Sequence, residues 1–434
     1  MIKTKKQIVI LGAGLSGLAA GEILSKHFNV KIFETKPYIG GLAATFEKNG
    51  KRIPLFYHHI VKSNKYTLEY LKKFCEIRNL KWKKIRVAIG IDKKIFVINS
   101  FFGLLKFDYL SFYERFRLGL FGVYCLFFMK PEKLKDDLDA ETWLRKYVGK
   151  SVTDKIFYHL YARNKFNIPL NKISAKQFAN RLYEKETSDF FTFPRQGYQC
   201  MIDGLKKEIE KNNGGIKIHS RVEEINLNEK YLIESGEKIN FDILISTIPF
   251  EIFIKINKEL PNDFKEKVSR IRYCPAISLC FGTEDFLKKG VYWINLFNER
   301  VHIIMQHSVL ADIYDNKINW CLRYGGSEED SKLKDVEIER IYLNIIKKYF
   351  PKVKIKWVKV VKEKYAEPIY DIEYKKHMPD YRSPIPGLYF AGIQLTYPKI
   401  RNMNSALESG IRVADMVLKD NNPDTTSDEM VSID

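Results

Sequence analysis

Cysteine is scarce in this sequence, with six residues among 434. None forms a C-x-x-C pair, and none has a neighbouring histidine at the spacing of metal ligands. This pattern argues against a disulfide-rich scaffold and against a cysteine-based zinc module. We therefore expect buried thiols in a reducing compartment and no metal site. The six residues are Cys75, Cys125, Cys200, Cys274, Cys280 and Cys321.

Long hydrophobic runs are lacking as well. The longest uncharged apolar run is LGLFGVYCLFFM, residues 118–129, whereas a helix that crosses a bilayer needs about 20 such residues. The N-terminus MIKTKKQIVI enters a predicted strand directly, without the apolar region or cleavage site of a signal peptide. We expect a cytoplasmic protein, and the short apolar run leaves open a peripheral contact with the inner face of the membrane.

Acidic residues are outnumbered, because 53 Asp and Glu stand against 73 Lys and Arg, which gives a formal net charge of +20. No nucleic-acid-binding motif accompanies this surplus, so we expect no nucleic-acid partner. The surplus is either compositional or forms a basic face for a diphosphate or an anionic membrane. The expected partner is a small-molecule substrate that is apolar or carries phosphate or carboxylate groups.

The chain shows no internal repeat with a period of 20–50 residues. Strand-like and helix-like patterns alternate, which predicts an α/β fold with a discontinuous, Rossmann-like dinucleotide-binding domain. That domain would comprise residues 1–90, 196–250 and 381–420. Residues 91–195, aromatic and mostly helical in pattern, and 251–380, with helices and strands, would form an inserted α+β substrate domain. Residues 421–434 are polar and acidic, which predicts a disordered tail.

The stretch IVILGAGLSGLAAGEIL, residues 8–24, places a G-x-G-x-x-G motif between an apolar strand and a helix. Gly12 permits a tight turn, Gly14 lets the backbone approach a pyrophosphate, and Gly17 lets the helix pack against the strand. The helix N-terminus offers unpaired N–H groups and the positive end of its dipole to the phosphates. The predicted binding turn consists of Gly12, Ala13, Gly14, Leu15, Ser16 and Gly17.

Glu34 lies 22 residues beyond Gly12, at the end of a second predicted strand, VKIFE. A carboxylate at this position accepts hydrogen bonds from ribose hydroxyls and repels a 2′-phosphate. NADP is therefore the least expected dinucleotide, whereas NAD and FAD share all of these features.

The sequence from 8 to 46 resembles the flavoproteins with two glycine signatures, a clan that includes amine oxidases, protoporphyrinogen oxidases, phytoene desaturases and UDP-galactopyranose mutases. After Glu34 the chain reads TKPYIGGLAATF, and in that clan a second glycine pair, here Gly40 and Gly41, passes close to the FAD diphosphate. The resemblance implies FAD as the cofactor; an ordinary Gly-Gly turn is the plain alternative.

Two later stretches resemble the same clan. In RVEEI, residues 221–225, the resemblance implies that Val222 meets the adenine through its backbone. In YFAGIQ and NMNSALESGIRVA it implies that Gly392 approaches the phosphates and that a helix beginning near Asn404 points at the pyrimidine edge of the flavin. Many relatives carry an acidic residue directly after FAG, where this chain has Ile393 and Gln394.

The stretch FYHHIVKSNKYTLEYLKKF, residues 56–74, resembles a histidine-containing strand of the mutases. We expect His58 or His59 to line the flavin face; the alternative is a structural pair at a strand end. The aromatic stretch 101–129 fits a tunnel wall for an apolar substrate, an interfacial helix, or an ordinary core-facing helix. Scattered arginines would clamp an anionic substrate group only if they converge, and these are Arg163, Arg181, Arg195, Arg300 and Arg323.

A flavin supplies its own reactivity, which explains why the sequence shows no convincing nucleophile triad or carboxylate pair. No catalytic residue is named from the sequence. The resemblance implies an FAD-dependent oxidoreductase of the protoporphyrinogen oxidase and amine oxidase type, which transfers a hydride from a substrate C–H or C–N bond to flavin N5. The alternatives are a non-redox flavin-dependent sugar mutase, which resembles UDP-galactopyranose mutase, and a protein that keeps FAD only as a structural module.

Overall fold

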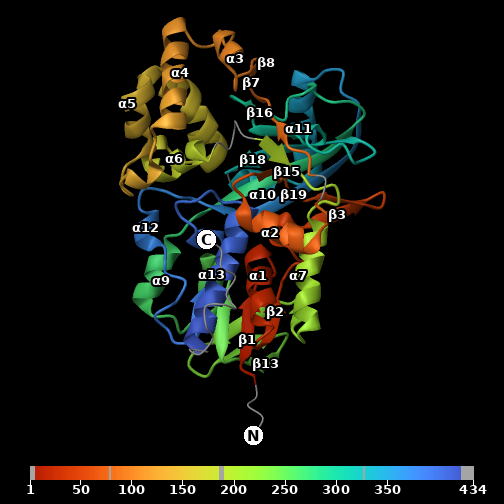
Figure 1. Ribbon diagram of the computed structural model, residues 1–434, viewed down its shortest axis with the longest axis vertical. Coiled ribbons are helices and arrows are strands. Elements are labelled where there is room, and N and C mark those ends of the chain that lie inside the picture. Colours follow the sequence, from red (N-terminus) through yellow and green to blue (C-terminus); the bar gives the residue numbers. More distant parts are fainter. Residues whose placement is uncertain (1–4, 78–79, 185–189, 326–327, 422–434) are drawn as a thin grey trace.

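The computed structural model describes residues 5–77, 80–184, 190–325 and 328–421. A five-stranded parallel sheet forms the lower half of the molecule in Figure 1, with the strand order β10-β2-β1-β14-β20. Its strands come from three separate parts of the chain: β1 (Gln7–Leu11), β2 (Asn29–Phe33), β10 (Gly215–Lys217), β14 (Ile243–Ser246) and β20 (Leu388–Phe390).

Both faces of this sheet are covered, which explains why its strands read as continuous apolar runs. Ile8 and Ile10 of β1 pack into one core with the helices, whereas Val9 and Leu11 pack into a second core on the other face. The helices of the first face are α1 (Leu15–Leu24), α2 (Lys65–Phe74), α7 (Gln199–Lys211) and α13 (Met403–Asn421). The second core includes β11 (Val222–Asn226), β12 (Tyr231–Glu234), α8 (Phe250–Ile256) and α9 (Asn262–Ser269), and β13 (Glu237–Asn240) completes the small sheet.

A seven-stranded sheet stands above the parallel one, and helix α11 (Asp335–Tyr349) packs on it. All neighbouring strands in it are antiparallel except β16 and β7, which run parallel. In sheet order the strands are β19 (Ile355–Pro368), β15 (Tyr273–Thr283), β18 (Lys317–Tyr324), β17 (Ile303–Gln306), β16 (Trp293–Leu296), β7 (Val87–Ile91) and β8 (Lys94–Val97).

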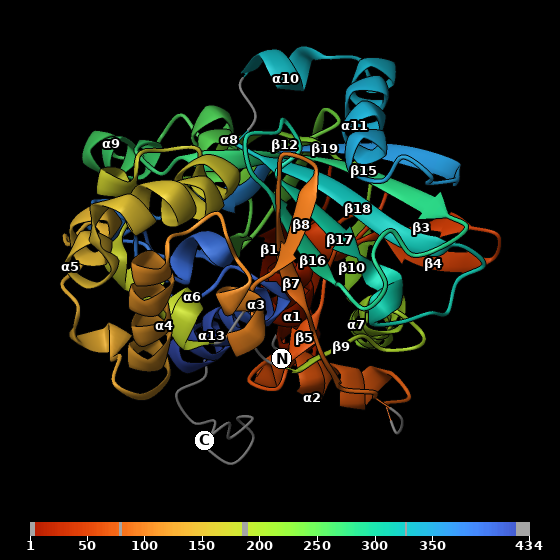
Figure 2. The ribbon, with the colours of Figure 1, turned by 90° about the horizontal axis from the view of Figure 1, so that it is seen from above.

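A helical unit with its own core stands beside this sheet, on the left of Figures 1 and 2. It consists of α3 (Phe101–Leu105), α4 (Phe112–Phe127), α5 (Ala140–Val152), a π-helical segment (Thr153–Phe166) and α6 (Ala175–Tyr183). The remaining elements are β3 (Thr45–Lys48), β4 (Lys51–Pro54), β5 (Ile60–Val61), β6 (Lys83–Lys84), β9 (Phe190–Thr192), α10 (Glu328–Lys332) and α12 (Tyr374–His377).

The predicted fold class is confirmed: a parallel sheet covered on both faces carries the glycine-rich turn after its first strand, and mixed α and β elements follow. Within the described residues, no helix has both the length and the apolarity needed to span a membrane. Helix α13 extends to Asn421, and the rest of the predicted disordered tail, residues 422–434, lies outside the described residues.

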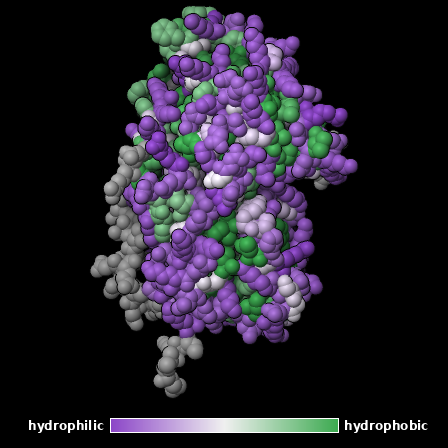
Figure 3. Space-filling view, turned by 90° about the vertical axis from the view of Figure 1, so that its right-hand side faces the viewer, coloured by the Kyte–Doolittle hydropathy of each residue, from purple (hydrophilic) through white to green (hydrophobic). Residues whose placement is uncertain are grey.

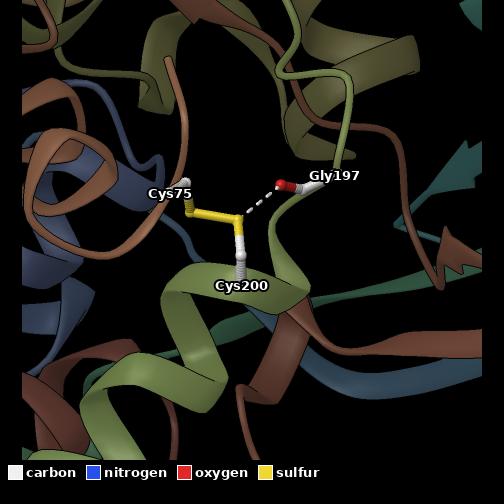
Figure 4. Close-up of a disulfide and its surroundings, with 3 residues drawn as sticks. All are labelled: Cys75, Gly197 and Cys200. Atoms are coloured by element: carbon white, nitrogen blue, oxygen red, sulfur yellow. Dashed lines mark hydrogen bonds between the residues drawn. A yellow bond between two sulfur atoms is a disulfide. The ribbon is translucent and has the colours of Figure 1, made fainter.

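The prediction of six thiols is wrong for two cysteines. Cys75 directly follows α2, Cys200 lies in the first turn of α7, and a disulfide joins them across 125 residues of sequence (Figure 4). Their spacing in sequence gave no signal, because the fold alone brings the ends of α2 and α7 together. The other four remain thiols. Burial raises the pKa of Cys125 and Cys274 to about 12, so both stay protonated and unreactive at neutral pH.

Candidate cofactor site

The turn between β1 and α1 depends on glycine at two positions for different steric reasons. Gly12 has a φ of +96°, and a Cβ there would lie 2.6 Å from Oγ1 of Thr247. At Gly17 a Cβ would lie 2.0 Å from the carbonyl oxygen of Gly12. Only glycine lets α1 approach the turn this closely, so the sequence motif has a direct steric basis here.

Gly14 is different, because a Cβ there would meet no atom within 4 Å. It is the residue before α1, and no side chain caps the helix N-terminus. The first intrahelical bond runs from the Leu18 N–H to the Gly14 carbonyl oxygen at 2.9 Å, so the N–H groups before Leu18 have no acceptor within the helix. The turn thus combines free backbone donors, a positive dipole end and open space at one point.

The Glu34 side chain is buried against this turn. Its Oε2 accepts the Ala13 N–H at 2.9 Å, and its Oε1 accepts the Lys36 N–H at 2.8 Å. The Glu34 carbonyl oxygen accepts the Ser220 N–H at 2.8 Å, which brings the start of β11, with Val222, to the end of β2. Oε1 also accepts the Thr35 hydroxyl at 3.4 Å, whereas Oε2 retains a second lone pair, so the carboxylate can accept a further hydrogen bond.

The second glycine pair lies directly on the first. The Gly40 N–H donates to the Ala13 carbonyl oxygen at 2.8 Å, and a Cβ on Gly41 would lie 3.1 Å from Cα of Gly14. Gly40 has a φ of +100° and Gly41 a φ of +57°, a backbone region that favours glycine. The two glycine signatures of the sequence therefore form one continuous backbone surface.

The C-terminal segment reaches the same place. β20 pairs with β14, which pairs with β1, and the Gly392 N–H donates to Ser409 Oγ of α13 at 2.8 Å. Ser16 Oγ of α1 donates to the Ala406 carbonyl oxygen at 2.8 Å, so the first turns of α1 and α13 touch. Asn404, also in the first turn of α13, accepts the Thr67 N–H at 3.2 Å.

Gln394 lies two residues after Gly392, and its side chain is buried. Its Nε2 donates to the Ala391 carbonyl oxygen at 2.9 Å, so the amide folds back onto its own turn. A Cβ on Gly392 would lie 2.5 Å from Gln394 Oε1. The glutamine thus packs over Gly392 as a neutral group.

His58 and His59 lie at the junction between the parallel sheet's helices and the seven-stranded sheet. His58 Nε2 lies 2.8 Å from the Leu42 carbonyl oxygen, and burial lowers the pKa of His58, so the neutral ring donates this hydrogen bond. The His59 ring stacks on Phe191 with 4.1 Å between centroids, and its Nδ1 lies 3.1 Å from the Tyr292 hydroxyl. His58 is therefore held by a hydrogen bond to the segment after Gly40–Gly41, and His59 contacts Tyr292, the residue before strand β16.

Several buried polar residues at this junction were missed by the sequence analysis. The Tyr324 hydroxyl donates to the Tyr57 hydroxyl at 3.3 Å, and burial raises the pKa of Tyr324 well above its ordinary value. His307 lies among aromatic rings, its ring nitrogens have no hydrogen-bond partner among the described residues, and burial lowers its pKa to about 3. Tyr57 comes from the segment between β4 and β5, His307 from the turn after β17 and Tyr324 from the end of β18, so no spacing in the sequence signalled them.

A buried ion cluster lies just before α13. Arg401 Nη2 lies 2.8 Å from Glu367 Oε2, and Lys165 Nζ lies 3.2 Å from Glu367 Oε1. Burial opposes ionisation of Glu367, yet the charges of Arg401 and Lys165 outweigh it and hold the pKa of Glu367 below its ordinary value. The Lys165 ammonium also lies 4.2 Å from the centre of the Tyr324 ring. This cluster joins the π-helical segment, β19 and the start of α13.

Arginines predicted as a possible clamp do not all converge. Arg300 and Arg323 share the carboxylate of Asp330, and Arg163 donates to the Glu299 carbonyl oxygen at 2.9 Å. Arg181 is buried beside the Phe166 ring. Within the described ranges, no group of three or more His, Cys, Asp or Glu side chains has an arrangement suited to a metal ion.

Comparison with known proteins agrees with this geometry. A family model described as flavin containing amine oxidoreductase matches residues 15–418. The 15-cis-phytoene desaturase of Solanum lycopersicum is 24% identical over 477 residues, which covers 95% of this chain and 78% of the desaturase. The crystal structure of a protoporphyrinogen oxidase homologue from Exiguobacterium sp. 255-15 has a TM-score of 0.75 at 14% identity, covering 95% of this chain and 98% of the other. Reduced UDP-galactopyranose mutase has a TM-score of 0.73 at 15% identity, covering 95% and 94%.

Proposed function

The chain belongs to the flavin containing amine oxidoreductase family, and we propose that it is an FAD-dependent oxidoreductase that removes a hydride from a C–H or C–N bond of an apolar small molecule. One observation carries the proposal. The two glycine pairs, the Gly392 turn and the N-termini of α1 and α13 meet at a single edge of the parallel sheet. Ligands of open parallel sheets bind at the carboxyl ends of the strands, which is this edge.

The residues at this edge fit a dinucleotide. The space beside the Cα of Gly14 is open, since a Cβ built there would have no described atom within 4 Å. Helix α1 begins at this point, and no described side chain caps its N-terminus. A diphosphate in that space would accept hydrogen bonds from the free N–H groups of the first turn. An N-terminal turn closed by side chains would argue against such a ligand; this one is open.

We assign roles to the predicted site residues on this basis. The turn Gly12–Gly17, Gly40–Gly41 and Gly392 would hold the diphosphate, and the Glu34 carboxylate would accept the ribose hydroxyls. The backbone at Val222, next to the end of β2, would meet the adenine. The first turn of α13, with Asn404, would direct its positive dipole end toward the pyrimidine edge of the flavin.

When bound, FAD would supply a hydride acceptor at N5, and its reoxidation would require an oxidant such as oxygen or a quinone. The chain's own contribution is to position the substrate and exclude water. Burial keeps the Tyr292 and Tyr324 hydroxyls protonated and keeps the His58 and His307 rings neutral. The aromatic rings and neutral imidazoles of this junction favour an apolar substrate, because the nearby cations Lys165 and Arg401 are paired with Glu367. The relatives named phytoene desaturases support the same choice.

A second candidate is a non-redox flavin-dependent sugar mutase. The histidine pair at residues 58–59 and the net charge of +20 favour a nucleotide-sugar substrate, and the fold is shared with UDP-galactopyranose mutase. The aromatic junction around Tyr324 favours the oxidoreductase instead. A diphosphate needs cationic or N–H partners, and the cation beside the Tyr324 ring, Lys165, is already paired with Glu367.

The cofactor assignment is tested by purification and release. We expect a yellow protein whose denaturation releases FAD rather than FMN or NAD. The Glu34→Arg variant should lose most of its FAD, since a cation replaces the ribose acceptor and the partner of the Ala13 N–H. The matched control is Glu229→Arg, an exposed carboxylate on the turn between β11 and β12. A colourless protein that binds NAD, or full FAD occupancy in Glu34→Arg, would contradict the proposal.

Reduced protein separates the two candidate reactions. The flavin is reduced with dithionite under nitrogen, and its absorbance is followed while either a quinone or a UDP-sugar is added. The oxidoreductase predicts rapid reoxidation by the quinone and no response to the UDP-sugar. Tight binding of the UDP-sugar to the reduced form alone would favour the mutase.

A further inference from the structure

Helices α3 and α4, together with Phe128 directly after α4, carry eleven of the sixteen exposed large apolar side chains of the described chain. On α4 the exposed positions recur at intervals of three and four residues, so they form one stripe along the helix. The stripe consists of Tyr113, Phe116, Leu120, Val123 and Phe127. Phe112, Leu126 and Phe128 flank it, and α3 adds Phe101, Phe102 and Leu105. We call these eleven residues the apolar face.

The opposite side of α4 is firmly anchored. Phe121 is 5% exposed and packs edge-on against Trp143 of α5, with 5.5 Å between ring centres. The buried Glu114 carboxylate lies 2.8 Å from Lys155 Nζ, and Arg117 Nε donates to the Tyr147 carbonyl oxygen at 2.9 Å. The packed side of the helix is therefore complete without the apolar face. The core-helix interpretation of this stretch is wrong for its outer face.

The apolar face stands at one end of the molecule. Figure 1 places α3 and α4 at the top, and Figure 3 shows hydrophobic side chains at that end. The two helices are held together there, since a Cβ on Gly119 of α4 would make ordinary contact with Leu104 of α3 at 3.6 Å. Two neighbouring helices at one end of the molecule that expose apolar side chains suit insertion into the interfacial region of a bilayer.

The charges around the face are mainly basic. Residues 101–135 contain six Lys and Arg against three Asp and Glu, and between Arg117 and Lys130 there is no charge at all. Exposed Lys106 precedes α4, and exposed Lys130 and Lys133 follow it, so cations lie at both ends of the face. This arrangement matches an anionic leaflet, where the lysines would meet headgroups while the aromatic rings enter the acyl boundary.

The same charges disfavour a second copy of the chain as the occupant. In a twofold interface each patch meets itself, so the lysine ends would come close to like charges across the contact. We propose that the apolar face of α3 and α4 docks the protein on the surface of an anionic phospholipid bilayer, without crossing it. This goes beyond the flavin assignment and is independent of it.

The test is flotation of the purified holoprotein with vesicles, which needs neither substrate nor turnover. Two kinds of vesicle are compared: pure phosphatidylcholine, and phosphatidylcholine with about 30% anionic phosphatidylglycerol, which attracts basic side chains. The variant is Phe116→Ser with Phe127→Ser; serine and phenylalanine have similar helix propensities, so α4 should persist. The control is Val336→Ser on α11, a helix with an equally exposed apolar residue that lies on the opposite side of the molecule from α4 in Figure 2.

We expect the wild type and Val336→Ser to float with anionic vesicles. The double Phe variant should bind at least about tenfold less, since two apolar rings would no longer enter the bilayer. Lys130→Gln with Lys133→Gln should weaken binding to anionic vesicles selectively. Unchanged thermal midpoints and flavin content would show that the variants fold.

Three outcomes would overturn the proposal. The first is failure of the wild type to float with either vesicle. The second is equal flotation of the double Phe variant. The third is a wild-type dimer in lipid-free buffer that the Phe substitutions convert to monomer, with no vesicle binding, because the occupant would then be a second copy.

Discussion

Gly14 and Gly17 lie three positions apart in one turn, yet the space around them differs completely. A methyl group on Gly14 would point into open space, whereas one on Gly17 would collide with the Gly12 carbonyl oxygen. The φ of Gly14 is −71°, which alanine adopts freely. Within this motif, a methyl group at Gly14 should therefore affect ligand binding, whereas a methyl group at Gly17 should affect folding.

The Gly14→Ala variant should fold normally but bind flavin at least about tenfold more weakly, a loss of about 1.4 kcal/mol, because its methyl group occupies the space assigned to the diphosphate. Titration of the apoprotein with FAD, followed by fluorescence quenching, measures this. Gly17→Ala is the matched comparison and should lose about 1–3 kcal/mol of unfolding free energy through overpacking. Equal FAD affinity in Gly14→Ala and the wild type would contradict the assigned role.

The buried His307 predicts a pH dependence of stability. Its folded pKa is about 3 against an ordinary value of 6.5, so the unfolded chain binds this proton more readily than the folded one. Stability should therefore fall as pH drops below about 6.5, by about 2 kcal/mol between pH 7 and pH 5 for this group. The measurement is urea unfolding across that range, compared with His307→Phe, which keeps a ring but does not titrate. The same pH slope in both proteins would exclude this origin.

The roles of residues that contact their neighbours in the sequence were predictable. The roles of residues whose contacts come from distant parts of the chain were not. Gly12 and Gly17 are read from local sequence because one strand, one turn and one helix already dictate their contacts. Tyr324 and Glu367 acquire their environment only when β18 and β19 come beside the start of α13. Their chemistry depends on tertiary packing, which no local pattern encodes.

At the scale of elements, a short continuous apolar run was the reliable signal. Strand β1 was predicted because both faces of the sheet bury it, so its sequence is continuously apolar. Pairings were not predictable: β7 and β16 run side by side although about 200 residues separate them. For the same reason, the contact between the ends of α2 and α7, where Cys75 and Cys200 form a disulfide, was not predictable from the sequence.

The Cys75–Cys200 disulfide should stabilise the contact between these two helices. It closes a loop of 125 residues in the unfolded chain, so reduction should lower the free energy of unfolding by about 2–5 kcal/mol. Urea unfolding with and without a phosphine reductant measures the difference, and thiol titration in denaturant should find four free thiols before reduction.

The control for reduction is the Cys75→Ser, Cys200→Ser double variant, whose stability should not respond to the reductant. Cys125→Ser, a half-buried thiol on α4, should keep the full response. A wild-type protein with six titratable thiols would show that the disulfide does not form in solution.

At the scale of the whole molecule, the candidate site joins segments that lie far apart in the chain. Residues near 14, 40, 222, 392 and 404 approach one edge of a sheet whose strands come from three separate segments. The resemblance could indicate each segment because its glycines and strand–helix boundaries are local features. Their convergence is a property of the sheet order, which only the folded chain displays.

This convergence predicts that FAD stabilises the protein globally, because the complete site exists only in the folded chain. A ligand at 100 times its dissociation constant should add about 2.7 kcal/mol to the unfolding free energy. The thermal midpoint of the apoprotein should therefore rise with FAD concentration. Gly14→Ala should start from the same apoprotein midpoint and show a much smaller rise, since its methyl group affects only the bound state. An equal rise of the thermal midpoint in both proteins would show that FAD binds away from Gly14. A rise with NAD and none with FAD would show that the ligand is NAD.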